Sequence, residues 1–254
     1  MKIINPSRSV LKNTIILIFL LITTGCTAGT RTPISEIDIQ DAAPYGIKGV
    51  RVWGDELGNQ QIDTVLRRQV SIMKNIYADA IASGEPIHQT FLALSGGGPD
   101  GAFGAGLLAG WTKRGDRPEF DVVTGVSTGA IVGLFAFLGP EFDQNLQEIY
   151  TEYKTDQLIE PTIFSALTGG TSITDATGYN TLIDKYIDDN VVALIAEEAR
   201  KGRLLLIGTT NLDAARPVVW NVTNIAASGH PNAKALIRDL VRASSAIPAV
   251  FPPI

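Results

Sequence analysis

The sequence predicts a three-layer α/β/α fold, in which helices cover both faces of a mostly parallel central sheet. From residue 89 onward, short apolar runs alternate with longer segments of helical pattern, and that alternation is typical of a parallel sheet. The runs are almost entirely apolar, as expected for strands buried on both faces. Two of them lead directly into glycine-rich turns that precede helices.

The elements follow from residue spacing and from breakers. Apolar residues recur at helical spacing over 62–82, and the SGEP segment at 83–86 ends that helix. Residues 27–61 are polar without a sustained period, which predicts a tether and an extended lead-in. We expect strands at 89–95, 120–124, 203–210 and 217–222. Helices are expected at 102–114, from the second glycine turn to 138, and at 143–153, 179–188, 191–201 and 231–245.

The N-terminus resembles the signal peptide of a bacterial lipoprotein. A positively charged start precedes an apolar stretch over 15–22 that is too short to span a bilayer. Cys26 follows the small residue Gly25, as in a lipobox. The resemblance implies cleavage before Cys26, acylation of its thiol and, because Thr27 rather than Asp follows, anchoring to the outer membrane of the cell envelope. The alternative is an ordinary secretory signal with an incidental cysteine.

Three segments result from this reading. Residues 1–25 are expected to be the signal peptide, 26–88 a tether with a helical extension, and 89–254 a single α/β domain. Cys26 is the single cysteine, so no internal disulfide can form. A net charge of −5 without a basic stripe argues against a nucleic-acid partner. No His, Cys or carboxylate cluster has metal-ligand spacing, so neither a metal nor a cofactor is implied.

The strongest chemical signal is a G-x-S-x-G pattern between a strand and a helix, formed by Gly125, Ser127 and Gly129. Such a tight turn raises the serine hydroxyl above the sheet edge and points the N-terminus of the next helix toward it. We therefore expect Ser127 to be a nucleophile. The alternative is a glycine-rich turn with an idle serine.

A second loop, SGGGPDG at 95–101, also joins a strand to a helix. Its glycines leave backbone N–H groups uncovered, and such a nest can stabilise an oxyanion. Gly96, Gly98 and Gly101 also fit the dinucleotide pattern G-x-G-x-x-G, which requires an acid at the end of the second strand. Asp121 lies instead at the start of that strand, so an oxyanion loop is favoured over a dinucleotide site.

The two loops should face each other at one sheet edge, which is the geometry of acyl transfer. A hydrolase triad of the α/β type places its histidine after the serine. Of the two histidines, His88 precedes the serine and His230 lies in a turn before a helix. We therefore expect activation without histidine, and an esterase that depends on His230 is the weaker alternative.

With the closing segment RASSAIPAVFPP at 242–253, the two loops resemble the patatin-like phospholipases over residues 89–254. The resemblance implies a patatin-like fold and a Ser–Asp dyad with Ser127 as nucleophile. It implies that Gly96, Gly97 and Gly98 supply the oxyanion hole. It further implies an acyl-enzyme mechanism on membrane lipid or another lipid ester.

The sequence departs from the family pattern at two places. Asp100 stands in the glycine loop where many members have a basic residue. The family's catalytic aspartate belongs to a D-G-[GA] segment after the F-P-P stretch, whereas this sequence ends at Ile254. Its only D-G-A, at 100–102, lies within the glycine loop, and Asp121 and Asp213 are expected to be structural. We therefore expect a fragment that lacks the catalytic aspartate and the C-terminal part of the fold.

These observations predict a lipid-anchored serine acyl hydrolase that acts in lipid metabolism. The alternative is a catalytically inactive envelope lipoprotein of the same fold that binds lipid or a protein partner.

Overall fold

The computed structural model describes residues 35, 38–39, 42–56, 60–153, 160–161, 174–248 and 250–254. The expected signal peptide and Cys26 lie outside these ranges. The strands are β1 (Arg51–Trp53), β2 (Phe91–Leu94), β3 (Val122–Val126), β4 (Glu160–Pro161), β5 (Thr174–Asp175), β6 (Leu204–Asn211) and β7 (Arg216–Asn221). The α-helices are α3 (Gln60–Ile76), α4 (Ala78–Ser83), α5 (Gly101–Arg114), α6 (Thr128–Leu138), α7 (Asp143–Thr151), α10 (Thr177–Tyr186), α11 (Asp189–Arg200), α12 (Val222–Ala227) and α13 (Ala233–Ser245).

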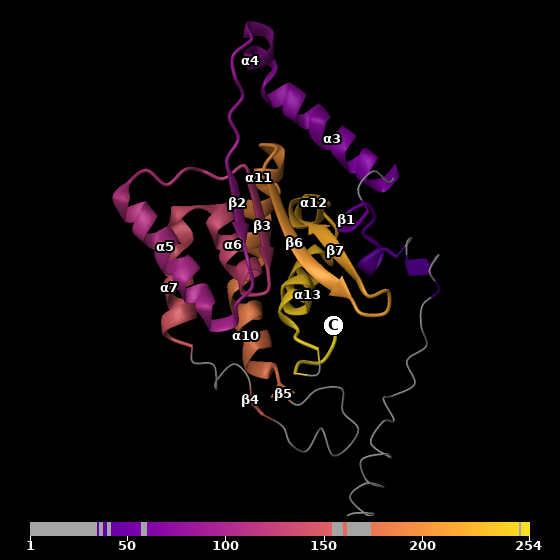
Figure 1. Cartoon of the computed structure of the whole chain (residues 1–254), viewed down its shortest axis with the longest axis vertical. Helices are drawn as coiled ribbons and strands as arrows, with labels where there is room; N and C mark the ends of the chain where they lie inside the picture. Colours follow the sequence, from indigo (N-terminus) through magenta and orange to yellow (C-terminus); the bar gives the residue numbers. More distant parts are fainter. Residues whose placement is uncertain are drawn as a thin grey trace, which may run out of the picture.

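A mixed sheet with the strand order β1-β7-β6-β3-β2 lies at the centre of the molecule (Figure 1). Strands β2, β3 and β6 are parallel, and helices connect them, as parallel pairing requires. Strand β7 is antiparallel to β6 because the short 212–215 turn joins the two as a hairpin. The α/β class and the parallel pairing of the central strands are thus confirmed.

Strand β1 has no counterpart among the elements expected from the sequence. Arg51–Trp53 pairs antiparallel with β7, so part of the segment expected to be a tether belongs to the sheet. Trp53 is 3% exposed, and the Arg51 guanidinium lies 5.3 Å from the centroid of its ring. The polar surroundings of this short strand conceal it in the sequence, because a strand of three residues has no measurable period.

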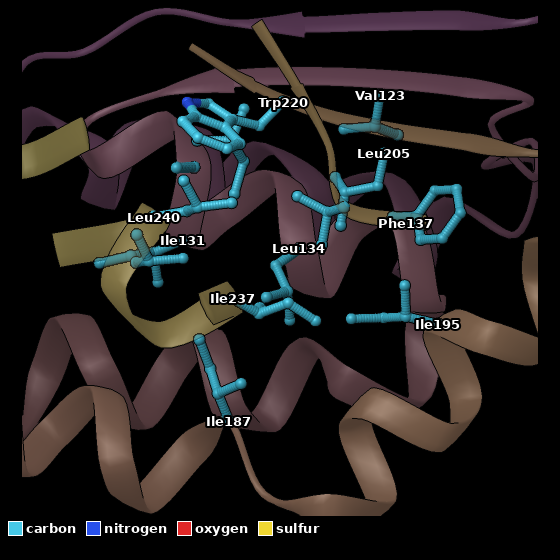
Figure 2. Packing of buried hydrophobic residues seen from close by; sticks show 14 of the residues in the cluster. Val123, Ile131, Leu134, Phe137, Ile187, Ile195, Leu205, Trp220, Ile237 and Leu240 are labelled. Atoms are coloured by element: carbon cyan, nitrogen blue, oxygen red, sulfur yellow. The ribbon is translucent and has the colours of Figure 1, made fainter. Parts of the chain in front are cut away.

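The centre of the core is α6, a helix in which every residue is buried. A helix that is apolar all round belongs inside a protein rather than on its surface. Figure 2 shows Leu134 and Phe137 of α6 in one cluster with Val123 and Leu205 of the sheet and Ile237 of α13. Burying one such side chain contributes about 1.5–3 kcal/mol to stability.

The two faces of the sheet differ in burial. Helices α6, α12 and α13 contact the sheet on the face that carries Val123, Leu205 and Ile207, which are all fully buried. On the opposite face, Phe91 is 68% and Val126 is 48% exposed. Within the described ranges, the helices that contact the sheet most extensively therefore lie on one face, whereas the opposite face carries exposed apolar side chains.

The remaining helices agree with the expected ranges within a few residues, with two differences. The helix expected at 62–82 is divided at Tyr77 into α3 and α4. The short helix α12 was not expected, and the side chain of Asn221 caps it by accepting a hydrogen bond from the N–H of Asn224 at 2.8 Å. No helix in the described part of the chain is long and apolar enough to cross a membrane.

Candidate active site

Ser127 occupies a sharp turn between the last residue of β3 and the first residue of α6. Its backbone has φ 56° and ψ −126°, a conformation that residues other than glycine rarely adopt. Such a conformation costs about 1–3 kcal/mol and persists only where the surrounding structure enforces it. A strained strand-to-helix turn is the known geometry of a nucleophile elbow.

The two glycines of the elbow are required by close backbone approach. A Cβ atom on Gly125 would lie 2.2 Å from the carbonyl oxygen of Gly129. A Cβ atom on Gly129 would lie 2.4 Å from the carbonyl oxygen of Leu94, at the end of β2. No side chain fits at either position without moving the backbone, so these residues bring the start of α6 against the neighbouring strand.

The glycine loop lies directly against Ser127. Strand register sets Leu94 beside Gly125, so the loop that follows β2 and the elbow that follows β3 share one sheet edge. A Cβ atom on Gly96 would lie 3.0 Å from the Ser127 Cβ and 3.7 Å from its Oγ. Gly98 has φ +55°, which favours glycine. The structure thus brings together the two loops that the sequence singles out.

Backbone donors in this loop are unoccupied. Within the described ranges, the N–H groups of Gly96, Gly97 and Gly98 donate to no protein atom, and the loop is exposed. Free N–H groups beside a serine hydroxyl can bind the oxyanion of a tetrahedral intermediate. Asp100 closes the loop by donating its N–H to the Gly97 carbonyl at 3.1 Å.

The elbow is held by Ser244, a residue to which the sequence assigns no role. The Ser127 N–H donates to the Ser244 Oγ at 2.8 Å, and the Ser244 hydroxyl donates to the Gly208 carbonyl at 2.7 Å. Ser244 lies within the RASSAIP segment, so the segment's resemblance to a known family was the available signal. Its hydrogen bonds span 117 and 36 residues, and no local pattern reveals contacts of that length.

A partly buried tyrosine, Tyr150, joins the starts of α5 and α6. The Tyr150 hydroxyl and the Thr128 hydroxyl form a hydrogen bond. A Cβ atom on Gly101 would lie 2.5 Å from the Tyr150 hydroxyl oxygen, so the glycine at the start of α5 is also required by packing. Burial raises the pKa of Tyr150 above its ordinary value, and the hydrogen bond between Tyr150 and Thr128 opposes that shift. Tyr150 is therefore neutral at physiological pH.

A second tyrosine lies behind the C-terminal end of α13. The Tyr179 hydroxyl donates to the Ser245 Oγ at 2.6 Å. Burial raises the pKa of Tyr179 to about 12, so this hydroxyl also stays protonated. The residues Ser244 and Ser245 thus link α13 to two different parts of the structure, the elbow and α10.

Neither histidine is near Ser127. His230 lies in the turn before α13, where its Nδ1 accepts the N–H of Asn232 at 3.1 Å. Ser244, the residue bonded to Ser127, lies near the other end of α13, about 17 Å along the helix at 1.5 Å per residue. His88 is exposed and precedes β2, so it lies where the parallel strands begin, whereas Ser127 lies where they end. This geometry removes the support for a histidine-dependent esterase.

Of the two acids expected to be structural, Asp121 holds two strands together. The Asp121 carboxylate accepts hydrogen bonds from the Thr90 N–H at 2.7 Å and the Thr90 hydroxyl at 3.0 Å. It ties the starts of β2 and β3 together, about one strand length, or 20 Å, from Ser127. Asp213 is exposed in the turn between β6 and β7. Among the described residues, the Ser127 hydroxyl has no hydrogen-bond partner, and no group of three His, Cys or carboxylate residues could hold a metal ion.

More than half of the chain matches a known protein family. A family model described as Patatin-like phospholipase matches residues 92–254. The matched range begins in β2 and contains the glycine loop, the elbow and Ser244. A search of curated proteins found no match.

Proposed function

Because this chain belongs to the patatin-like phospholipase family, we propose that it hydrolyses lipid acyl esters with Ser127 as the nucleophile. Family membership supports lipid hydrolase activity in general. The observation that carries the finer proposal is the approach of Gly96 to Ser127, where an added Cβ would lie 3.0 Å from the serine Cβ. The Ser127 hydroxyl and the free backbone N–H groups are thereby close enough to contact the same acyl carbonyl group.

The proposed reaction has two steps. Ser127 Oγ attacks the acyl carbonyl carbon while a general base takes the serine proton, and the negative charge on the carbonyl oxygen is stabilised by the N–H groups of the 96–98 loop. The C–O bond to the leaving alcohol breaks as that alcohol takes up the proton, which leaves an acyl-enzyme. Water then attacks the ester carbonyl, the same base accepts its proton, and the fatty acid is released with the Ser127 hydroxyl restored.

For the general base we propose an aspartate of a D-G-[GA] segment, as the family resemblance implies. The D-G-A at 100–102 does not fill this role, because it lies in the oxyanion loop and Asp100 is exposed at the start of α5. None of the described carboxylates bonds to the Ser127 hydroxyl. This last observation is also what supports the second candidate function, an inactive envelope lipoprotein that binds lipid or protein.

We further propose that the chain is anchored to the cell envelope, in the outer membrane, by acyl chains on Cys26. Each methylene buried in the bilayer contributes about 0.8 kcal/mol, so more than one chain is needed for stable anchoring. The intact mass of the protein purified from membranes of its source cell tests this. A mass that fits an unmodified N-terminus contradicts the anchor.

Labelling with a fluorophosphonate ester tests the nucleophile. We expect the protein to be labelled on the peptide that contains Ser127 and to hydrolyse a medium-chain acyl ester. Ser127→Ala should abolish both, and Ser83→Ala, at the exposed end of α4, is the matched control that should retain both. Full hydrolysis by Ser127→Ala would refute the assignment, whereas a folded protein that is neither labelled nor active supports the lipoprotein alternative.

A further inference from the structure

One hydroxyl connects the elbow to two other elements. Ser244, in the last turn of α13, accepts the Ser127 N–H at 2.8 Å and donates to the Gly208 carbonyl at 2.7 Å. Gly208 is the register partner of Val126, so it lies in β6 directly beside the residue that precedes Ser127. Both bonds are partly buried, which strengthens them relative to bonds in water.

This arrangement determines what the Ser127 backbone can do. Its N–H is already engaged by Ser244 and points to α13. The amide is therefore unavailable to an oxyanion, and the task falls to the free N–H groups of the 96–98 loop. The same bond fixes the rotation of the peptide group that carries Ser127, whose positive φ requires support from outside the turn.

We propose that Ser244 is a positioning residue for the hydrolysis. It holds the elbow backbone so that the Ser127 hydroxyl faces the glycine loop, and it acts through the Ser127 amide rather than on the substrate. The inference rests on the proposed function, because it requires Ser127 to be the nucleophile. A purely structural role for Ser244, in packing α13 on the sheet, would affect stability without affecting the chemical step.

The neighbouring serine provides a matched control. Ser245 lies on the same turn of α13 and accepts a hydrogen bond of similar length, 2.6 Å, from Tyr179. Ser245→Ala therefore removes one hydrogen bond near the elbow without touching Ser127. Ser244→Thr keeps the hydroxyl and is the conservative variant, so the experiment compares Ser244→Ala, Ser244→Thr and Ser245→Ala with the unmodified full-length protein.

We expect Ser244→Ala to lower kcat for an acyl ester by about 10- to 100-fold, because displacements of up to 1 Å at the reacting atoms have effects of this size. KM should stay within about twofold, since the acyl-binding surface is not changed. Fluorophosphonate labelling of Ser127 should slow by the same factor as kcat. Ser244→Thr should recover most of the rate. Ser245→Ala should lower Tm about as much as Ser244→Ala does, but should keep kcat within about twofold of the unmodified protein.

Several results overturn the proposal. They are an unchanged kcat and labelling rate in Ser244→Ala, an equal loss in Ser245→Ala, and a loss that appears only in KM. Each of these leaves the proposed function intact, because the unmodified protein is active in all of them. If the unmodified protein is folded but is neither labelled nor active, the proposed function fails, and a positioning role for Ser244 fails with it.

Discussion

Replacing Gly96 with alanine should disable the candidate active site without unfolding the protein. The new Cβ would lie 3.0 Å from the Ser127 Cβ, 3.5 Å from the Val126 carbonyl oxygen and 3.7 Å from the Ser127 Oγ. The first distance is shorter than ordinary van der Waals contact, so either the glycine loop or the serine must move by several tenths of an ångström. The loop is exposed and free to shift, whereas the elbow is held by Ser244.

The magnitude follows from that displacement. A shift of the proposed oxyanion donors relative to the proposed nucleophile should lower kcat/KM by about 100-fold, which corresponds to about 2.7 kcal/mol of transition-state stabilisation. Stability should change little, because Gly96 is exposed and does not have a left-handed φ. We expect Tm to stay within about 4 °C of the unmodified protein, equivalent to roughly 1 kcal/mol for a domain of this size.

The assay compares acyl ester hydrolysis and thermal unfolding of Gly96→Ala with those of Gly106→Ala. Gly106 lies on the exposed side of α5, and a Cβ there would meet no atom within 4 Å. Alanine in the interior of a helix is more favourable than glycine by about 0.5–1 kcal/mol, so the control should be slightly more stable and fully active. Gly96→Ala with the kcat/KM of the unmodified protein would show that this loop does not supply the oxyanion donors.

Three further changes test other parts of the site and fold. Tyr150→Phe should lower the free energy of unfolding by about 1 kcal/mol, because the Thr128 hydroxyl loses its hydrogen-bond partner. Urea unfolding measures this change, and an unchanged midpoint would argue that the Tyr150–Thr128 hydrogen bond does not stabilise the fold. Asp100→Asn should raise kcat/KM about twofold at low salt, because it removes a negative charge from the glycine loop that is proposed to bind the oxyanion. The gain should vanish at high salt, and a gain that persists there excludes an electrostatic origin. Burial raises the pKa of Glu198, but hydrogen bonds from its cationic partners lower it more, so that its pKa lies below the ordinary 4.5. Its contribution to stability is thus present above pH 4.5 and is lost as the pH falls through the lower folded-state pKa, so Glu198→Gln should flatten the dependence of Tm on pH in this acid range; a curve identical to that of the unmodified protein contradicts the reasoning.

Much of the fold is encoded in local sequence patterns. The apolar run at 89–95 and the glycine turn after it specify β2 and the loop that follows, because strands, turns and helix starts depend on neighbouring residues. The need for glycine at Gly125 and Gly129 can likewise be predicted from the sequence motif, since the tight turn has no room for side chains. A shared sheet edge for the two loops follows from parallel pairing of successive strands.

The sequence by itself thus determined the fold class, the order of most elements and the two loops that meet at Ser127. Only the tertiary structure decided how the elbow is held, through Ser244 and Tyr150, and that Arg51–Trp53 pairs with β7 as a strand of the sheet. It also decided that His230 lies at the wrong end of α13 to act on Ser127. The physical reason is the range of the interactions: propensities and turns act over a few residues, whereas the bond from Ser127 to Ser244 spans 117 residues and forms only after the helices have packed on the sheet.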